Sequence, residues 1–208
     1  MFIIGITGGT GAGKSTALQT LQALGAFVID CDKIYHEALL TDEDMKADIK
    51  ANFSDVLTDG EIDRKKLGEI VWNDPVSLSK LNSITHKYIS YEIERHIKHL
   101  EEQGGKLLVI DAIALIESGL NQRCDIVVGV TASLEKRLSR IMNRDDLTKE
   151  AALNRINAQQ PESFYRDNCD YILENIYDKQ AAFEDKCSAF FKELISNKNR
   201  DTNGDAVT

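Results

Sequence analysis

Residues 8–15, Gly8-Gly9-Thr10-Gly11-Ala12-Gly13-Lys14-Ser15, fit the pattern G-x-x-x-x-G-K-[ST] of a phosphate-binding loop. An apolar run at residues 2–6 precedes the loop and a helical pattern follows it, which is the strand–loop–helix context that the pattern requires. Glycine lets the backbone turn tightly and approach an anion, because no Cβ atom intervenes. A glycine-rich turn without a ligand is the alternative, but the position and context favour a nucleotide site.

The residue types in the loop predict how it binds the nucleotide. Its N–H groups and the start of the following helix attract phosphate oxygens. Lys14 is expected to reach the terminal phosphates of ATP, and the Ser15 hydroxyl to hold Mg²⁺. The predicted nucleotide contacts of this segment are Gly9, Thr10, Gly11, Ala12, Gly13, Lys14, Ser15 and Thr16.

Length and charge limit the classes of protein to consider. The 208 residues suit one compact domain with small appendages, and a formal charge of −9 argues against binding nucleic acid, whose phosphates recruit basic surfaces. No apolar run is long enough to span a bilayer, and no positively charged leader precedes the loop, so a cytosolic location is expected. Composition predicts no particular oligomeric state.

The cysteines are expected to be reduced and structural. No C-x-x-C pair occurs, which in a cytosolic chain argues against disulfides and zinc sites. One of them, Cys31, lies between two aspartates, where filling the end of a strand is favoured over a functional thiol. The four residues are Cys31, Cys124, Cys169 and Cys187.

Short apolar runs alternate with helical patterns, which predicts an α/β fold with a five-stranded parallel sheet covered on both faces. The expected strands are 2–6, 26–30, 106–110, 125–130 and 171–174. The expected helices outside the two excursions described next are one from the loop to about Leu24 and one over 179–195. The nucleotide-binding core is predicted to comprise 1–32, 105–132 and 167–196.

Two helical excursions and a tail complete the predicted organisation. Residues 33–104 contain no convincing strand and are expected to form a helical cap at the carboxyl edge of the sheet, where open α/β sheets bind ligands. Residues 133–166 are expected to form a helical lid, and the polar residues 197–208 a disordered tail. The helices expected in the cap are 33–51, 63–72 and 75–102, and the expected helix caps are Asp74, Ser133 and Thr148, with Pro161 opening a third lid helix.

Aspartates follow the second and third predicted strands. Asp30 and Asp32 are two positions apart, so in an extended segment both would face the phosphate loop and could accept a proton or organise Mg²⁺. Asp111 ends the third strand, as the metal-supporting aspartate of nucleotide-binding enzymes does. The alternatives are a helix cap for either Asp30 or Asp32, and a turn residue for Asp111.

A basic row lies in the predicted lid. On a helix Arg137, Arg140 and Arg144 share one face, and Lys136 adds to the cluster. Such a row suits a lid that closes over ATP and neutralises charge on the transferred phosphate. A solvated basic face paired with Asp145 and Asp146 is the alternative.

Residues 3–175 together resemble the dephospho-coenzyme A kinase family. The loop is similar to the family's T-G-G-x-G-x-G-K-S, and Val28–Asp32 to its V-I-D-x-D. The remaining matches are Leu81-Asn82 with His86, Arg140 with Arg144-Asp145, Arg155-Ile156 with Gln159, and Asp170 with Asn175.

The resemblance implies a P-loop nucleoside or nucleotide kinase fold and the last step of coenzyme A synthesis. In that step ATP phosphorylates the ribose 3′-hydroxyl of dephospho-coenzyme A, giving coenzyme A and ADP. By resemblance Asp32 is the base, Lys14 and Arg140 stabilise the transferring charge, and Ser15 and Asp111 organise Mg²⁺. Arg140 and Arg144 join the predicted ATP contacts. The predicted acceptor contacts are Asp30, Asp32, His86 and Asp111.

The chain departs from the family at two positions near the acceptor. Lys87 follows His86 where the family has proline, and Ile113 stands where another proline is usual. A helix-surface histidine is the alternative for His86. Two alternative functions follow: another P-loop small-metabolite or nucleoside kinase with an altered acceptor, and a non-enzymatic nucleotide-binding regulator. No Asn-Lys-x-Asp follows an apolar strand, which disfavours a guanine-specific switch.

Overall fold

The structure is a computed structural model that describes residues 1–72 and 74–204. It divides into two compact units. One comprises Met1–Ile29 and the chain from Gly104 onward, and the other comprises Asp30–Gln103. The predicted boundaries of the helical insertion were 33 and 104, and the predicted lid, 133–166, lies in the first unit.

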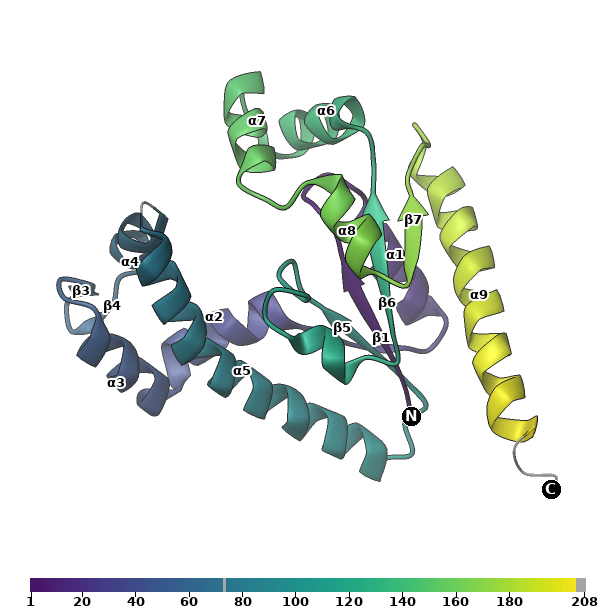
Figure 1. Cartoon of the computed structure of the whole chain (residues 1–208), viewed down its shortest axis with the longest axis horizontal. Coiled ribbons are helices and arrows are strands. Elements are labelled where there is room, and N and C mark those ends of the chain that lie inside the picture. Colours follow the sequence, from purple (N-terminus) through teal and green to yellow (C-terminus); the bar gives the residue numbers. More distant parts are fainter. Residues whose placement is uncertain (73, 205–208) are drawn as a thin grey trace. The chain divides into compact units, whose positions relative to one another are not determined.

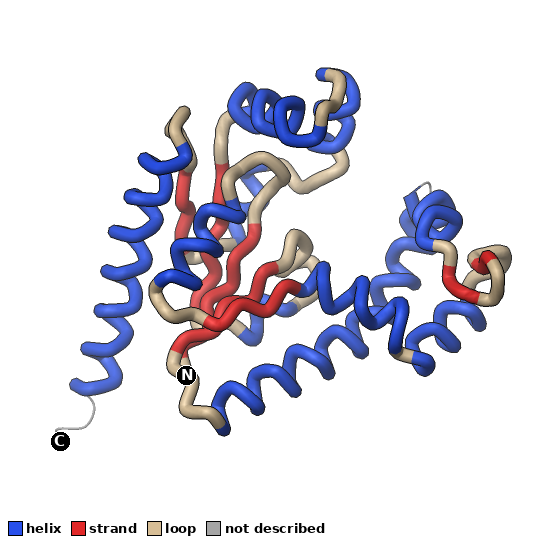
Figure 2. The backbone as a smooth tube through the Cα atoms, turned by 180° about the vertical axis from the view of Figure 1, so that it is seen from behind, coloured by secondary structure: helices blue, strands red, loops and turns tan. Residues whose placement is uncertain are grey.

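A five-stranded parallel sheet forms the centre of the first unit (Figure 2). Its strand order is β2-β5-β1-β6-β7. Strand β1 lies between β5 and β6, where Gly5 is in register with both Ile110 and Val127. The five predicted strands are confirmed to within one residue at each end. The central strands β5, β1 and β6 are buried on both faces and are therefore nearly continuous apolar runs, which is why the sequence reveals them. Their bounds are Phe2–Thr7 (β1), Phe27–Asp30 (β2), Leu107–Asp111 (β5), Ile126–Thr131 (β6) and Tyr171–Glu174 (β7).

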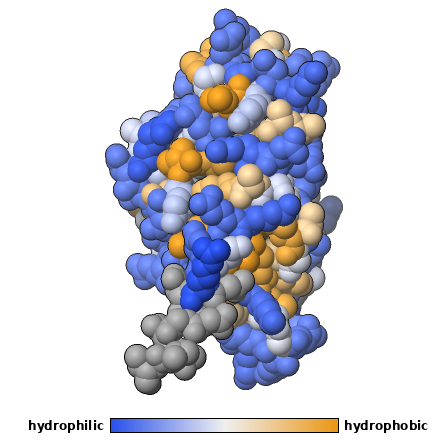
Figure 3. Space-filling view, turned by 90° about the vertical axis from the view of Figure 1, so that its right-hand side faces the viewer, coloured by the Kyte–Doolittle hydropathy of each residue, from blue (hydrophilic) through white to orange (hydrophobic). Residues whose placement is uncertain are grey.

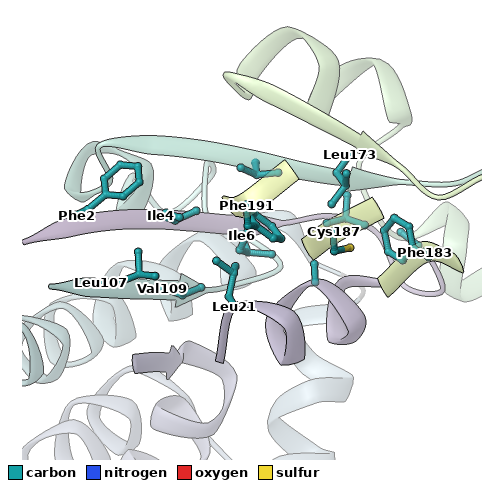
Figure 4. Close-up of a cluster of buried hydrophobic side chains, with 14 residues drawn as sticks. Phe2, Ile4, Ile6, Leu21, Leu107, Val109, Leu173, Phe183, Cys187 and Phe191 are labelled. Atoms are coloured by element: carbon teal, nitrogen blue, oxygen red, sulfur yellow. The ribbon is translucent and has the colours of Figure 1, made fainter. Parts of the chain in front are cut away.

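Helices α1 (Lys14–Ala23) and α9 (Gln180–Gly204) pack against one face of this sheet (Figures 1 and 4). The alternate strand residues that point to this face contact side chains of both helices. Each such buried side chain stabilises the fold by about 1.5–3 kcal/mol. Residues of this core include Ile4, Ile6, Leu107, Val109, Leu21, Phe183 and Phe191. On the opposite face a Cβ at Gly129 would approach Tyr165 of α8 (Glu162–Asn168).

The predicted lid contains three helices, α6 (Leu134–Asp145), α7 (Lys149–Asn157) and α8 (Figure 1). The predicted caps are confirmed: the hydroxyl of Ser133 accepts from the N–H of Lys136, and that of Thr148 from the N–H of Ala151. Pro161 directly precedes α8. A short 3-10 helix at Leu120–Arg123 lies between β5 and β6.

The second unit is helical and contains one small hairpin that was not predicted from the sequence. Helices α2 (Cys31–Thr41), α3 (Glu43–Asn52), α4 (Arg64–Trp72) and α5 (Pro75–Glu102) surround an apolar cluster that includes Leu39, Met45 and Ile49. Strands β3 (Leu57–Thr58) and β4 (Glu61–Ile62) pair antiparallel, so the expectation of no strand here is wrong. Asp59 and Gly60, both with positive φ, form the turn.

Two aspartates set helix boundaries in this unit. Asp42 divides the single helix expected over 33–51, because its backbone is extended and its carboxylate accepts from the N–H of Met45 (2.8 Å). Asp74 caps α5 as predicted, accepting from the N–H groups of Val76 and Ser77.

The C-terminal helix is longer than expected. Helix α9 continues to Gly204, so the prediction of a disordered tail is wrong for residues 197–204, while 205–208 lie outside the described residues. Lys198 explains part of the extension, because its Nζ bonds to Asp125 (3.2 Å) and lies 5.5 Å from the centre of the Phe2 ring. The face that carries α9 is mainly hydrophilic, with small apolar groups between (Figure 3). Among the described helices, none is both long and apolar enough to cross a membrane.

Candidate functional site

The phosphate loop connects the end of β1 to the start of α1 in a conformation that depends on glycine. Gly13 has a φ of 112° and precedes the first turn of α1, where the N–H of Thr16 donates to its carbonyl (3.0 Å). Gly8 has a φ of 144°, and a Cβ there would lie 2.3 Å from the carbonyl oxygen of Val130. Both positions disfavour residues with a side chain, so this conformation of the loop requires glycine at 8 and 13.

The backbone N–H groups at the base of this loop are available to a ligand. Within residues 1–72 and 74–204, those of Gly11, Gly13, Lys14 and Ser15 have no protein acceptor. Those of Gly13, Lys14 and Ser15 lie at the start of α1, where a helix leaves its N–H groups without partners, and the helix dipole adds positive potential. Such an arrangement is typical of sites that bind anions, phosphate groups among them.

A cavity of about 650 Å³ lies over the loop, entirely within the first unit. It brings together every predicted nucleotide contact except Ala12, whose side chain is buried in the core. Asn143 and Gln180 also line it, and sequence analysis had no signal for either. The lining residues are Gly8, Gly9, Thr10, Gly11, Gly13, Lys14, Ser15, Thr16, Ile113, Arg140, Asn143, Arg144 and Gln180.

Lys14 and Asp111 form an ion pair beside the loop. The Lys14 Nζ lies 2.5 Å from Oδ1 of Asp111, and the two side chains are 16% and 12% exposed. Asp111 ends β5, adjacent to β1, so the strand-end aspartate does lie at the loop. The Ser15 hydroxyl and the Asp111 carboxylate are hard oxygen donors that fit Mg²⁺, which takes its remaining ligands from phosphate and water. No cluster of three or more metal-binding side chains occurs among the described residues.

The predicted arginine row separates into three different environments. Arg137 is buried (9% exposed), and its Nε donates to the carbonyl of Thr10 (2.9 Å). Arg140 donates to the carbonyls of Gly11 (3.1 Å), Ala12 (3.2 Å) and Tyr177 (2.8 Å). Three arginines at helical spacing therefore do not act as one surface: the first two bind the backbone of the loop.

Arg144 is the member of the row that lies on the surface. It bonds to Asp145 through Nε (2.7 Å) and Nη2 (2.8 Å), so the alternative of a paired, solvated side chain applies to this residue. Burial lowers the pKa of Arg137 and of Arg140, whereas the bond to Asp145 raises the pKa of Arg144. Lys136 pairs with Asp178.

A second cavity, of about 230 Å³, adjoins the loop beside the β7–α9 connection. Asn175 donates from Nδ2 to the carbonyl of Ala12 (3.0 Å), and its buried Oδ1 has no partner in the described part of the chain. From the sequence, Asn175 is predicted only through the family resemblance. The other lining residues are Gly13, Thr16, Arg140, Tyr177, Asp178, Lys179, Gln180 and Phe183.

Asp30 and Asp32 belong to the second unit, and their geometry differs from the prediction. Asp30 caps α2, its Oδ1 accepting from the N–H of Lys33 (2.9 Å), which is the alternative left open for it. Cys31 already begins the helix, so the two aspartates do not share one side of an extended segment. No hydrogen bond to the Asp32 carboxylate is found in the described ranges.

His86 and Lys87 lie on α5 in the same unit. Partial burial lowers the pKa of His86 below its ordinary value of 6.5, so the ring is neutral at pH 7. Lys87, which replaces the family proline, binds Asp48 of α3 (2.5 Å) and lies 4.6 Å from the Tyr88 ring centroid. The other departure, Ile113, lines the larger cavity, and its carbonyl accepts from the Thr7 hydroxyl (2.9 Å). The approach of Asp30, Asp32 and His86 to the phosphate loop stays a prediction.

Comparisons with known proteins agree with the geometry of the loop. The model of the family described as dephospho-CoA kinase matches residues 2–180. The dephospho-CoA kinase of Latilactobacillus sakei is 35% identical over 175 residues, covering 84% of this chain and 87% of the relative.

Two solved structures have the same fold along nearly the whole chain. The crystal structure of TT1252 from Thermus thermophilus is 31% identical with a TM-score of 0.76, covering 93% of this chain and 97% of the other. Dephospho-CoA kinase from Campylobacter jejuni is 27% identical with a TM-score of 0.67, covering 94% and 98%. A phosphate loop of this geometry and matches of this extent lead to one conclusion: the chain belongs to the dephospho-CoA kinase family.

Proposed function

We propose that the chain transfers the γ-phosphoryl group of ATP to the ribose 3′-hydroxyl of dephospho-coenzyme A, giving coenzyme A and ADP. The observation that carries this proposal is the cavity over the phosphate loop, in a chain of this family. Unpaired N–H groups, Lys14 and two arginines converge on it, as a bound triphosphate requires.

On the donor side the triphosphate would lie along the loop. Lys14 would exchange the Asp111 carboxylate for a phosphate oxygen, and Arg140 and Arg144 would neutralise charge on the transferring group. Ser15 and Asp111 would hold Mg²⁺, whose positive charge stabilises the phosphates. The smaller cavity, beside Tyr177 and the unpaired Oδ1 of Asn175, suits the nucleobase, because it joins an apolar wall to a buried hydrogen-bond acceptor.

On the acceptor side Asp32 is proposed as the base that takes the proton of the 3′-hydroxyl. The carboxylate has no competing hydrogen bond in the described part of the chain, so it is available to a substrate hydroxyl. His86, being neutral, would bind the acceptor by hydrogen bonds and not by charge. Asp30 would act mainly by holding the first turn of α2, on which Asp32 lies.

The test is a reaction of the purified protein with ATP, Mg²⁺ and dephospho-coenzyme A, followed by mass spectrometry and by assignment of the phosphate position. We expect coenzyme A with a 3′-phosphate. An acceptor that lacks the 3′-hydroxyl is the control and should give no product. Phosphorylation of another metabolite in place of dephospho-coenzyme A would contradict the acceptor and favour a related kinase, and ATP binding without transfer to any acceptor would favour a regulator. A cytosolic location and the absence of a nucleic-acid partner stay predictions.

A further inference from the structure

Besides the bonds that Arg140 makes to Gly11 and Ala12, the phosphate loop and the predicted lid are joined at Thr10, which lies on the outer turn of the loop. Its N–H donates to Oε1 of Gln159 (2.8 Å), and its hydroxyl accepts from Nε2 of Gln159 (2.8 Å). Its carbonyl accepts from Nε of Arg137 (2.9 Å). All three polar groups of Thr10 are therefore bound by two side chains that lie 149 and 127 positions away.

The two side chains also bind each other. Nη2 of Arg137 donates to Oε1 of Gln159 (3.1 Å), which closes the network around Thr10. Gln159 lies in the connection between α7 and α8, and both ends of its amide are used. Arg137 comes from the first turns of α6 and pairs with no carboxylate in the described ranges. Its hydrogen-bond acceptors are neutral, and the Glu162 carboxylate acts on its charge without forming an ion pair with it in the described ranges.

At two glycines of the loop, Gly9 and Gly11, helix α6 lies very close to the loop backbone. The phosphate-binding pattern requires glycine only at positions 8 and 13, and it leaves positions 9 and 11 free. A Cβ at Gly9 would lie 2.4 Å from Nη2 of Arg137, and one at Gly11 would lie 2.8 Å from the carbonyl oxygen of Arg137. Glycine at position 9 therefore leaves room for the Arg137 side chain, and glycine at position 11 is favoured both by the backbone of α6 and by its own φ of 79°.

We propose that Gln159 and Arg137 are positioning residues that hold the outer turn of the phosphate loop, through Thr10, in the conformation that binds the triphosphate. The first half of α6 then stays in place and holds the loop, and it is not part of a moving lid. Any movement over the nucleotide is left to the end of α6, where the exposed Arg144 lies. This inference rests on the proposed function, since it takes ATP to be the ligand of the loop.

Titration calorimetry with Mg·ATP and, separately, with dephospho-coenzyme A tests the proposal on Gln159→Leu and Gln160→Leu. Gln160 is the matched control, because it is the same residue type at the next position and has no hydrogen bond in the described part of the chain. We expect Gln159→Leu to weaken ATP binding about tenfold or more, since at least two bonds to the loop are lost. Gln160→Leu should change it by less than about twofold, and neither variant should alter acceptor binding.

The same contact is tested from the side of the loop by Thr10→Val, which removes the hydroxyl, and Thr10→Ser, which restores it. Thr10→Ser should regain most of the ATP affinity that Thr10→Val loses. The double variant Thr10→Val/Gln159→Leu should lose less than the two single effects combined, because both remove one shared bond.

Wild-type ATP affinity in Gln159→Leu would overturn the proposal. So would an equal loss of affinity for both ligands together with a lowered Tm, which would mean that Gln159 only stabilises the fold. Because ATP binding is measured directly, a wild-type protein that bound ATP and failed to phosphorylate dephospho-coenzyme A would contradict the acceptor assignment alone.

Discussion

The two units of the molecule hold their candidate residues in different ways. In the first unit, five side chains from four distant segments bind the phosphate loop: Asp111, Arg137, Arg140, Gln159 and Asn175. In the second, Asp32 and His86 make no side-chain hydrogen bond in the described part of the chain, and an apolar cluster with surface ion pairs maintains the helices that carry them. The donor site is thus organised before a ligand binds, whereas the acceptor residues await partners that the substrate must supply.

The largest effect that this contrast predicts is on turnover. Asp32→Asn removes the proposed proton acceptor and should lower kcat about 10²- to 10⁴-fold, while the Kd for Mg·ATP stays close to that of the wild type. Steady-state kinetics and calorimetry measure the two quantities. Asp30→Asn is the matched control, because asparagine also caps helices, and it should lower kcat far less. Near wild-type kcat in Asp32→Asn would show that another group accepts the proton.

The next effect concerns the stability of the second unit. Ile49 is fully buried in its apolar cluster, so Ile49→Ala should lower the free energy of unfolding by about 2–5 kcal/mol. Urea unfolding followed by circular dichroism measures the change. Leu40→Ala, at an exposed position on α2, is the control and should change it by less than about 0.5 kcal/mol. Equal effects of the two substitutions would mean that this cluster does not stabilise the unit.

Those parts of the fold that follow from local pattern could be predicted from the sequence. The three central strands, β5, β1 and β6, are buried apolar runs, and the edge strands β2 and β7 are short apolar runs. Asp74 and Ser133 are of residue types that often cap helices. The β3–β4 hairpin was missed although Asp59-Gly60, a frequent hairpin turn, was visible. The extension of α9 to Gly204 has no such signal, because the contact of Lys198 with Asp125 joins distant positions.

The phosphate loop of the candidate site could be predicted from the sequence, whereas the contacts of the side chains around it could not. The spacing of Arg137, Arg140 and Arg144 predicts a shared helix face, and spacing alone cannot show which of the three lies against another segment. Likewise the pattern Asp30-x-Asp32 predicts two similar carboxylates only while the chain is extended, and the helix that starts at Cys31 separates their roles. Sequence thus predicts which groups are available, and tertiary contacts decide what each one does.

A smaller effect tests whether Asp30 stabilises the protein by capping α2. Asp30→Ala removes the cap of α2 and should cost about 0.5–2 kcal/mol of stability, whereas Asp30→Asn should cost only a fraction of that. Thermal unfolding of the two variants measures the difference. If Asp30→Ala and Asp30→Asn were equally stable, the bond to the N–H of Lys33 would contribute nothing, and the capping role of Asp30 would be contradicted.

The smallest predicted effect is a pH dependence that arises from His86. Burial lowers the pKa of His86 in the folded chain below the ordinary value of 6.5, so the unfolded chain binds a proton on this ring more readily. The contribution of the neutral ring to stability is therefore complete above about pH 6.5 and is lost as the pH falls through 6.5 toward the folded pKa. Urea midpoints at about pH 7, 6 and 5 should then fall less in His86→Gln than in the wild type. His99→Gln, an exposed position on the same helix, is the control. Parallel pH profiles for the wild type and His86→Gln would mean that the ring is as accessible in the folded chain as in the unfolded one. The His86 ring would then carry a positive charge below pH 6.5, and the acceptor would meet a charged group in place of a neutral one.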